Sequence, residues 1–591
     1  MYSEKNKIPW GAIVVVAAVL VFGCIIAGTL LFTRFLNQEN AGFTLTNPDE
    51  TTVETAPAGS VVVEIASSNT KENWMDELVA QFNAQQQKVS SGETIFVQVR
   101  HVTSGGSQSA ILDGTLTPTV WSPGDSSWVD GANQVWADRT GRPLVSEECS
   151  PTVYAPTGFA MWRPMAEALG WPDTSISWDD IVALSANPDG WASVGHPEWG
   201  AFKFGHTHPA FSNVGNQIMT ALVYSTLGTT SGLTTDQVYS DEVLEAFRRV
   251  EINTYHYGIQ NQTLIDVMAR RGPNYLHAIN SSEAAILKVN EELGDQLRFP
   301  LVFIFPGEGT FWSEHPYCIL EGDWVTDEQA EAAQAFESFL LARPQQELAI
   351  SNYLRPRDTT IPLHSPLSLE NGTDPRVTFA QVPALQSTTA EVSEAIKDVF
   401  YLTKKKASVV LVLDTSGSME GEKIKNAVES SVNFIERLDP DDEIYVFVYS
   451  GDDVIQLGQG GRKGDVGETL NRTIRGIFAD GNTPLFDSVC EATEFTNALQ
   501  IQHNAEGERR LYGIVVLSDG EDTSSNRTEN QMFQCLPSGE DVEGVKIFTI
   551  AYGDGADTDL LLRIANRTNG KTFQGDPDQI ERIYNAISAE Q

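Results

Sequence analysis

Residues 409–419 read Val-Val-Leu-Val-Leu-Asp-Thr-Ser-Gly-Ser-Met, an apolar run that breaks directly into an Asp-x-Ser-x-Ser pattern. An apolar run without polar alternation is typical of a strand that is buried on both faces of a parallel sheet. A helical pattern follows at 422–437. The carboxylate and the two hydroxyls should therefore lie at the carboxyl end of the strand, where open α/β sheets bind their ligands. Their oxygen atoms suit a hard cation such as Mg²⁺.

This pattern also has a simpler interpretation, in which Ser416 or Ser418 only caps the following helix. Two later segments favour a metal site. A loop ahead of the next long helical pattern offers the Thr483 hydroxyl, and a second apolar strand, 514–517, leads into Asp519. Each of these loops adjoins an element at the same edge of the predicted sheet, so the side chains can converge.

Residues 407–591 resemble a von Willebrand factor A-type (VWA) domain, and the resemblance implies a doubly wound, Rossmann-like α/β fold. Five residues match the metal-ion-dependent adhesion site (MIDAS) of that family in order and context: Asp414, Ser416, Ser418, Thr483 and Asp519. The resemblance implies a bound divalent cation, Mg²⁺ or otherwise Mn²⁺ or Ca²⁺. It also implies one coordination position left for a carboxylate of a partner protein.

The chain has 591 residues and a formal net charge of −41. The length predicts more than one domain. The charge argues against nucleic-acid binding, because nothing offsets repulsion from phosphates. We interpret the acidity as a heavily hydrated surface that also raises the local concentration of divalent cations.

Near the N-terminus, residues 13–32 run without a charge and would span about 30 Å as a helix, the thickness of a bilayer core. Lys5 and Lys7 precede the run, which predicts a single-pass anchor with its N-terminus in the cytoplasm. We expect a cytoplasmic N-terminus at 1–9, a transmembrane helix at 10–36, a flexible linker at 37–59, and an extracytoplasmic remainder. The run is too long for a cleaved signal peptide. A lipoprotein acylated on Cys24 is the alternative.

The next region, 60–385, opens with two strand–turn–helix units whose turns are 67–70 and 103–107. Backbone amides and helix N-termini at such turns suit an anionic or polar small ligand. Helix capping explains either turn taken alone.

Four further segments of this region lie at 119–128, 149–162, 200–215 and 315–324. Together with the two units above, they resemble a two-lobed bacterial extracellular solute-binding protein, similar to sulfate- and molybdate-binding relatives. Matching the ligand loops of that family nominates six hydroxyl residues: Ser68, Ser104, Ser107, Thr157, Thr207 and Ser212. The resemblance implies a small solute as partner but does not identify it.

Two further features of this region have plain interpretations. His206 and His208 share one face of a predicted strand, but no further ligand with standard spacing is near, so we expect them to line or border the cleft. A linker helix is expected at 386–406. Its end, lysines 404–406, is expected to be a solvated helix terminus that favours positive charge.

Four cysteines lie outside the membrane run, two in each predicted domain. In an oxidising compartment this distribution predicts one disulfide per domain, Cys149 with Cys318 and Cys490 with Cys535. Four buried thiols are the alternative.

These features predict a non-enzymatic, membrane-anchored, extracytoplasmic binding protein of bacteria. One domain would bind a small solute, and the VWA domain would bind a protein partner through its cation. A substrate-binding component of a transport system is the alternative, and a hydrolase is a third possibility. The sequence contains no Gly-x-Ser-x-Gly elbow, Walker loop or zinc motif that would favour an enzyme.

Overall fold

The computed structural model describes residues 56–575 except 211, 259, 451–452, 538–542 and 554. The predicted N-terminal segment 1–9, the transmembrane helix 10–36, most of the linker 37–59 and a helix expected at 577–589 lie outside the described residues. Within the part of the chain that is described, no helix is both long and apolar enough to cross a membrane.

The first lobe is built on a five-stranded sheet in the order β2-β1-β3-β11-β4. Strand β1 is parallel to β2 and β3, whereas β11 is antiparallel to both of its neighbours. The strands are β1 (Ser60–Ser67), β2 (Thr94–His101), β3 (Val120–Ser122), β4 (Ser150–Pro151) and β11 (Pro316–Ile319). The helices are α2 (Glu72–Ala84), α3 (Ser104–Asp113), α4 (Ser127–Thr140), α12 (Asp327–Leu340) and α13 (Arg343–Ser351).

The second lobe has its own five-stranded sheet in the order β10-β6-β9-β7-β8. The strands are β6 (Thr157–Trp162), β7 (Phe204–Thr207), β8 (Thr254–Gly258), β9 (Ala278–Ser282) and β10 (Leu301–Ile304). The helices are α5 (Arg163–Ala168), α6 (Trp178–Ala186), α7 (Asn213–Leu227), α8 (Thr235–Val238), α9 (Asp241–Glu251), α10 (Asn261–Arg271), α11 (Glu283–Leu293) and α14 (Ala390–Thr403). The chain passes between the lobes where the short strands β5 (Val153–Tyr154) and β12 (Arg355–Pro356) pair.

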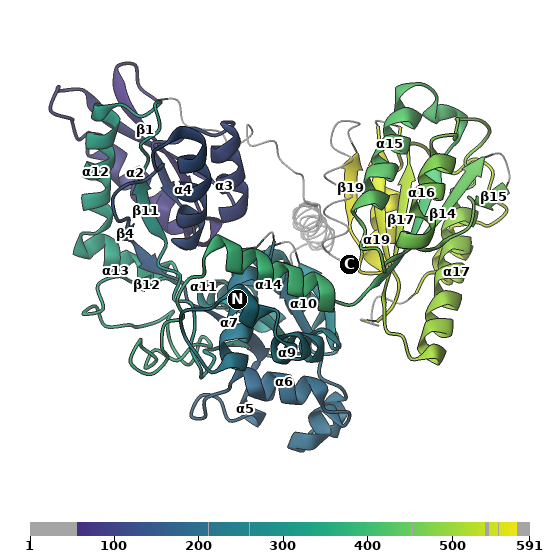
Figure 1. The fold of residues 1–591 in the computed structure, drawn as a ribbon, viewed down its shortest axis with the longest axis horizontal. Coiled ribbons are helices and arrows are strands. Elements are labelled where there is room, and N and C mark those ends of the chain that lie inside the picture. The colour runs from purple at the N-terminus through teal and green to yellow at the C-terminus, as the bar shows by residue number, and fades with distance from the viewer. Residues whose placement is uncertain are drawn as a thin grey trace, which may run out of the picture.

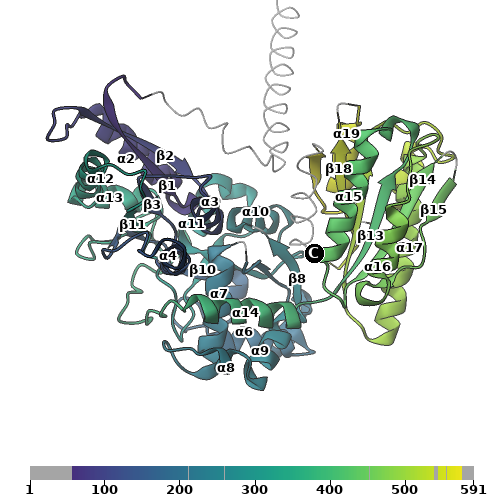
Figure 2. The same cartoon turned by 45° about the horizontal axis from the view of Figure 1, so that its top comes forward.

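The C-terminal domain is a mainly parallel sheet in the order β15-β14-β13-β17-β18-β19, with β16 paired to β14. The strands are β13 (Ala407–Asp414), β14 (Glu443–Ser450), β15 (Asp453–Gln456), β16 (Gly461–Arg462), β17 (Leu511–Ser518), β18 (Lys546–Tyr552) and β19 (Thr572–Gly575). The helices are α15 (Glu422–Arg437), α16 (Lys463–Ile474), α17 (Leu485–Glu506), α18 (Glu529–Cys535) and α19 (Thr558–Arg567). Helices cover both faces of the sheet (Figures 1 and 2).

Strand β13 explains why the apolar run around Val410 decides this fold. All eight of its residues are buried. Val409 and Leu411 pack into the core formed with α15 and α16, whereas Val410 and Val412 pack into the core formed with α17, α18 and α19. Because side chains alternate along a strand, only an uninterrupted apolar run can fill two cores at once. The prediction of a central buried strand is confirmed.

The expected linker helix is part of the second lobe. Helix α14 packs on α7, α8 and α9 (Figure 1), and it buries Val392, Ile396, Val399 and Phe400 in the core of that lobe. The expectation of a solvated lysine cluster after it was wrong, since Lys404 is 9% exposed and Lys405 is 8% exposed.

Lys405 is buried where the C-terminal domain lies against the second lobe. Lys405 Nζ lies 4.0 Å from the centre of the Tyr255 ring on β8, and burial lowers the pKa of Lys405 to about 8. Lys546 Nζ, at the start of β18, lies 3.1 Å from His256 Nδ1 and donates to Tyr255 O at 3.4 Å. Buried cationic side chains therefore form part of the contact between the two domains.

Both predicted disulfides are present. Cys149 joins Cys318, and Cys490 joins Cys535, with Cα–Cα distances of 4.8 Å and 5.8 Å.

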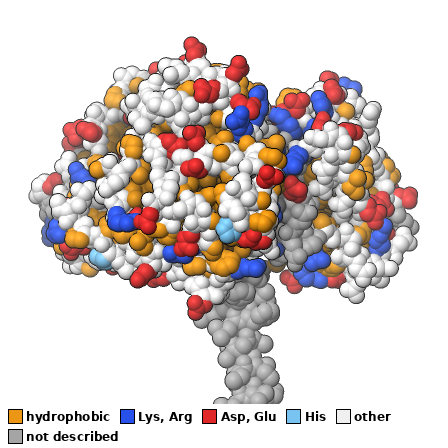
Figure 3. All heavy atoms as spheres, turned by 90° about the horizontal axis from the view of Figure 1, so that it is seen from below, with side chains coloured by type: hydrophobic (Ala, Val, Ile, Leu, Met, Phe, Trp, Pro, Cys, Tyr) orange, Lys and Arg blue, Asp and Glu red, His pale blue; other side chains and the backbone are white. Residues whose placement is uncertain are grey.

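On the face shown in Figure 3, acidic and basic side chains are interspersed rather than gathered in one patch.

Candidate functional site

Four of the five predicted metal-site residues touch one another at the carboxyl ends of β13 and β17. Asp414 Oδ1 accepts a hydrogen bond from Ser416 N at 2.9 Å. Ser416 Oγ and Ser418 Oγ lie 3.0 Å apart, and Ser418 Oγ donates to Asp519 Oδ1 at 2.7 Å. Ser518 Oγ, from the end of β17, donates to the other oxygen of Asp414 at 2.9 Å. The oxygens that the sequence predicted as ligands therefore form one cluster.

Thr483 is brought to the same edge by backbone contacts between loops. Gly417 N donates to Gly481 O at 3.0 Å, which holds the 480–483 segment against the turn after β13. Thr523 N donates to Thr483 O at 2.9 Å, and Thr483 N donates to Thr523 Oγ1 at 2.9 Å. These bonds fix Thr483 between the loops that carry Ser416 and Asp519.

The charges of this cluster fit a divalent cation. Burial raises the pKa of Asp414, and the neighbouring Asp519 carboxylate also raises it, against hydrogen bonds from Ser416 that favour the ionised form. A cation between the two carboxylates would offset both effects. Among the residues described, no group of three or more His, Cys, Asp and Glu side chains is placed to hold a metal. The fit rests instead on two carboxylates and three hydroxyls, a set of oxygen donors that suits Mg²⁺.

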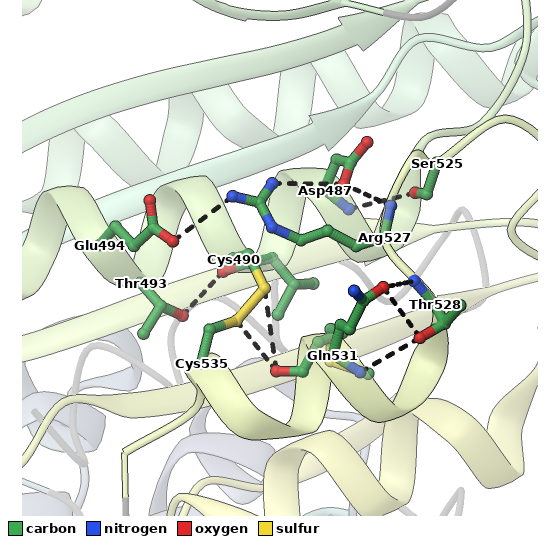
Figure 4. Close-up of a disulfide and its surroundings, with 11 residues drawn as sticks. Asp487, Cys490, Thr493, Glu494, Ser525, Arg527, Thr528, Gln531 and Cys535 are labelled. Atoms are coloured by element: carbon green, nitrogen blue, oxygen red, sulfur yellow. Dashed lines mark hydrogen bonds and ion pairs between the residues drawn. A yellow bond between two sulfur atoms is a disulfide. The ribbon is translucent and has the colours of Figure 1, made fainter.

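The first turn of α17 ties two of the metal-site loops together through Asp487, a residue that the sequence analysis did not single out (Figure 4). Asp487 Oδ2 accepts from Asn526 N at 2.7 Å, and Oδ1 accepts from Arg527 N at 3.1 Å and from the Arg527 guanidinium at 3.2 Å. Burial alone would raise the pKa of Asp487, but these donors lower it. One turn later, Cys490 is bonded to Cys535 on α18. In sequence, Asp487 is indistinguishable from an acidic residue that favours a helix N-terminus.

We expect Asp487→Asn to weaken Mg²⁺ binding about tenfold and to destabilise the domain by about 1–3 kcal/mol, because an amide replaces an acceptor oxygen facing Arg527. The matched control is Glu494→Gln, since Glu494 Oε1 accepts from the same guanidinium at 3.4 Å but is 60% exposed. Calorimetric Mg²⁺ titration and thermal unfolding measure the two effects. Equal effects of both substitutions would contradict a special role of Asp487.

The solute-binding region contains a cleft of about 180 Å³ lined by residues of both lobes. The N-termini of four helices lie on it: α3 through Thr103 and Ser104, α7 through Ser212 and Asn213, α10 through Gln260 and Asn261, and α11 through Ser282. Each terminus directs backbone N–H groups and the positive end of a helix dipole outward. These four termini therefore favour a negative charge in the cleft, whose lining also includes one acidic residue, Glu72.

Three of the six predicted solute residues line this cleft, namely Ser68, Ser104 and Ser212. The other three do not line it, and their hydroxyls form hydrogen bonds with other residues in the interior of the protein. Ser107 Oγ accepts from Trp121 Nε1 at 2.9 Å, Thr157 Oγ1 donates to Phe311 O at 3.4 Å, and Thr207 Oγ1 accepts from Asn280 Nδ2 at 3.0 Å. Sequence reasoning missed Asn261, whose buried Oδ1 has no hydrogen-bond partner among the described residues.

The two histidines do not line the cleft either. His206 Nε2 lies 3.0 Å from Glu251 Oε1, and both side chains are buried. His208 packs against Phe400 of α14 at a ring distance of 4.9 Å, and burial lowers its pKa to about 3. Both histidines face Phe400 of α14. Because the sequence analysis assigned that helix to a linker, it did not predict that the helix would cover them.

Comparison with known proteins matches the solute-binding region and the C-terminal domain to one family model each. Residues 63–353 match the family model of the bacterial extracellular solute-binding protein, and residues 408–586 match that of the von Willebrand factor type A domain. An uncharacterized protein of Synechocystis sp. is 27% identical over 166 residues, which is 28% of this chain and 36% of that relative. The match thus spans about a third of the relative's length.

Solved structures of both kinds are also similar. The sulfate-binding protein SubI of Mycobacterium tuberculosis is 13% identical, with 51% of this chain and 88% of that chain covered and a TM-score of 0.36. A periplasmic thiamin binding protein is 12% identical, with 60% and 99% covered and a TM-score of 0.41. A von Willebrand factor type A protein of Catenulispora acidiphila is 17% identical, with 31% and 42% covered and a TM-score of 0.27. From the two family matches, the chain joins a bacterial extracellular solute-binding domain to a von Willebrand factor type A domain.

Proposed function

We propose that this protein is a non-enzymatic, two-domain binding protein that captures a small anion and engages a protein partner. The observation that carries the first half is the convergence of four helix N-termini on the cleft between the lobes. No arginine is among the residues lining this described cleft, and the ammonium groups of its two lysines have partners of their own: Lys71 Nζ donates to Ser122 O at 2.8 Å, and Lys288 Nζ lies 3.8 Å from Glu292 Oε1. Recognition would therefore depend on backbone N–H groups, hydroxyls and amides, which suit a compact oxyanion.

A negative charge placed at Asn261 tests the sign of the charge on the ligand. Asn261→Asp keeps the shape of the side chain and adds a carboxylate to the cleft, so the affinity for an anion should fall about thirtyfold by repulsion. The probes are sulfate, phosphate and molybdate, titrated calorimetrically into the full chain. The control is Asn187→Asp, which adds the same charge at the end of α6 in the same lobe, away from the cleft. An unchanged or higher affinity in Asn261→Asp would show that the ligand is not an anion.

The second half of the proposal is a cation-dependent protein contact at the C-terminal domain. Asp414, Ser416, Ser418, Thr483 and Asp519 would hold Mg²⁺ or a similar divalent ion, which supplies an electrophilic centre for a partner's carboxylate. Ser416, Ser418 and Thr483 contribute neutral oxygens, so the charge of the ion is only partly neutralised by the protein. The hydrogen bonds between the three loops support a preformed set of donors.

We further propose that the chain is held in the cell membrane by residues 13–32, with its N-terminus in the cytoplasm and both domains outside. Two disulfides in the described domains agree with an oxidising compartment. Protease added to intact cells should release a fragment that begins near residues 37–60. A mature chain that begins with an acylated Cys24 would replace this proposal with a lipoprotein.

A further inference from the structure

A lysine shares a carboxylate of the metal site. Lys423, in the first turn of α15, places Nζ 2.5 Å from Asp519 Oδ2. The other oxygen of Asp519 accepts from Ser418 Oγ at 2.7 Å. The Asp519 side chain is fully buried, whereas the Lys423 side chain is 37% exposed. One oxygen of Asp519 thus belongs to the cluster of predicted metal ligands, and the other is paired with a cation of the protein itself.

The position of Lys423 is set by the surrounding fold and not by its own helix alone. Its side chain runs beside Gly553, the residue after β18, which has a φ of +81°. A Cβ at Gly553 would lie 3.5 Å from Lys423 Cε and 3.6 Å from Nζ. Lys425, two residues further along α15, differs from Lys423 in its partner and in its exposure. It pairs with Glu422 of the same turn and is 68% exposed.

We propose that Lys423 sets the affinity and the electrophilicity of the divalent cation at this site. The inference rests on the proposed metal site and deepens it. The Lys423 ammonium offsets part of the charge of Asp519, which leaves Asp414 as the carboxylate whose full charge faces the cation. It also repels a divalent ion bound beside Asp519. Both effects weaken cation binding, and both leave more of the ion's charge for an incoming carboxylate.

A purely structural role of Lys423 predicts the opposite sign. If the ammonium only held Asp519 in position, its loss would misplace a ligand, and the cation would bind more weakly. If Lys423 acts as we propose, its loss frees a carboxylate oxygen and removes a positive charge, and the cation binds more tightly. The direction of the change therefore separates the two roles without any knowledge of the protein partner.

The experiment is a calorimetric titration of Mg²⁺, repeated with Mn²⁺, into the full chain in detergent. Asp414→Ala supplies the background from the acidic surface of a chain with a net charge of −41. In Lys423→Met we expect the Kd for Mg²⁺ to fall about tenfold, a change limited by the partial exposure of the lysine. Lys423→Arg should restore the wild-type Kd, and Lys425→Met should leave it unchanged.

An unchanged or raised Kd in Lys423→Met would overturn the inference while leaving the metal site intact. Absence of cation binding above background in the wild type and in every variant would overturn the metal site as well. Thermal unfolding confirms that each variant is folded. Lys423→Gln, which keeps a polar head, replaces Lys423→Met in the titration if the latter does not fold, with the same expected direction.

Discussion

Asp414→Ala should lower the affinity for Mg²⁺ by more than about a hundredfold, beyond the 10- to 100-fold that loss of an outer-shell partner costs. Asp414 lies at the end of the central strand. Because Lys423 is paired with Asp519, Asp414 is the candidate anionic ligand that has no basic partner among the described residues of the site. Its loss leaves mainly hydroxyl oxygens to hold the ion. Cation-dependent binding of any protein partner should disappear with it.

The fold should survive this substitution. Ser416 N and Ser518 Oγ lose an acceptor, which costs about 1–3 kcal/mol. Removal of a buried carboxylate beside Asp519 offsets part of that cost, because burial and Asp519 both raise the pKa of Asp414. Calorimetric titration measures the affinity, and a cooperative thermal transition shows the fold. The control is Asp453→Ala, which removes an exposed carboxylate from β15. Normal Mg²⁺ binding by Asp414→Ala would reduce the motif to a capped turn.

Removal of the Cys490–Cys535 disulfide should destabilise the C-terminal domain by about 3–4 kcal/mol in the chain-entropy view. The bond closes a segment of 45 residues that contains the Asp519 loop. It joins α17 to α18 next to the contacts of Asp487 (Figure 4). Cys490→Ser with Cys535→Ser therefore should also weaken Mg²⁺ binding.

The distribution of tryptophan allows this effect to be assigned to one domain. All 12 Trp residues precede residue 325: Trp10 lies in the N-terminal segment and the other 11 lie between residues 74 and 324, so a Trp fluorescence transition on unfolding reports on the solute-binding domain and not on the C-terminal domain. In the double serine variant the fluorescence transition should persist, while calorimetry shows an earlier transition of the other domain. The matched control, Cys149→Ser with Cys318→Ser, should shift the fluorescence transition instead. A shift of both transitions by either pair would show that the domains unfold as one unit.

The sequence alone determined the features that depend on local order. The uninterrupted apolar run of β13 specified a strand buried on both faces, since each alternate residue must meet a core. The Asp-x-Ser-x-Ser turn lies next to that strand, so its position at the sheet edge followed from chain order. The disulfide pairs followed from two cysteines per domain, and both pairs are present.

Only the tertiary structure decided features that depend on distant segments. The sequence predicted that lysines 404 and 405 form a solvated helix end. In the structure Lys405 is buried against Tyr255, which precedes it by 150 residues. Ser107 follows Ser104 by one turn of α3, but its hydroxyl accepts a hydrogen bond from Trp121 of strand β3 and does not face the cleft. The four helix N-termini of the cleft lie far apart in sequence and meet only when both lobes have folded.

The difference has one physical reason. Hydrophobic periodicity reports how a residue relates to its own helix or strand, and chain order places the ends of neighbouring parallel strands. The role of a polar or charged side chain depends on which partner, brought by another element, satisfies it. For Asp519 that partner is Lys423, 96 residues away in sequence, and no local pattern encodes the pairing.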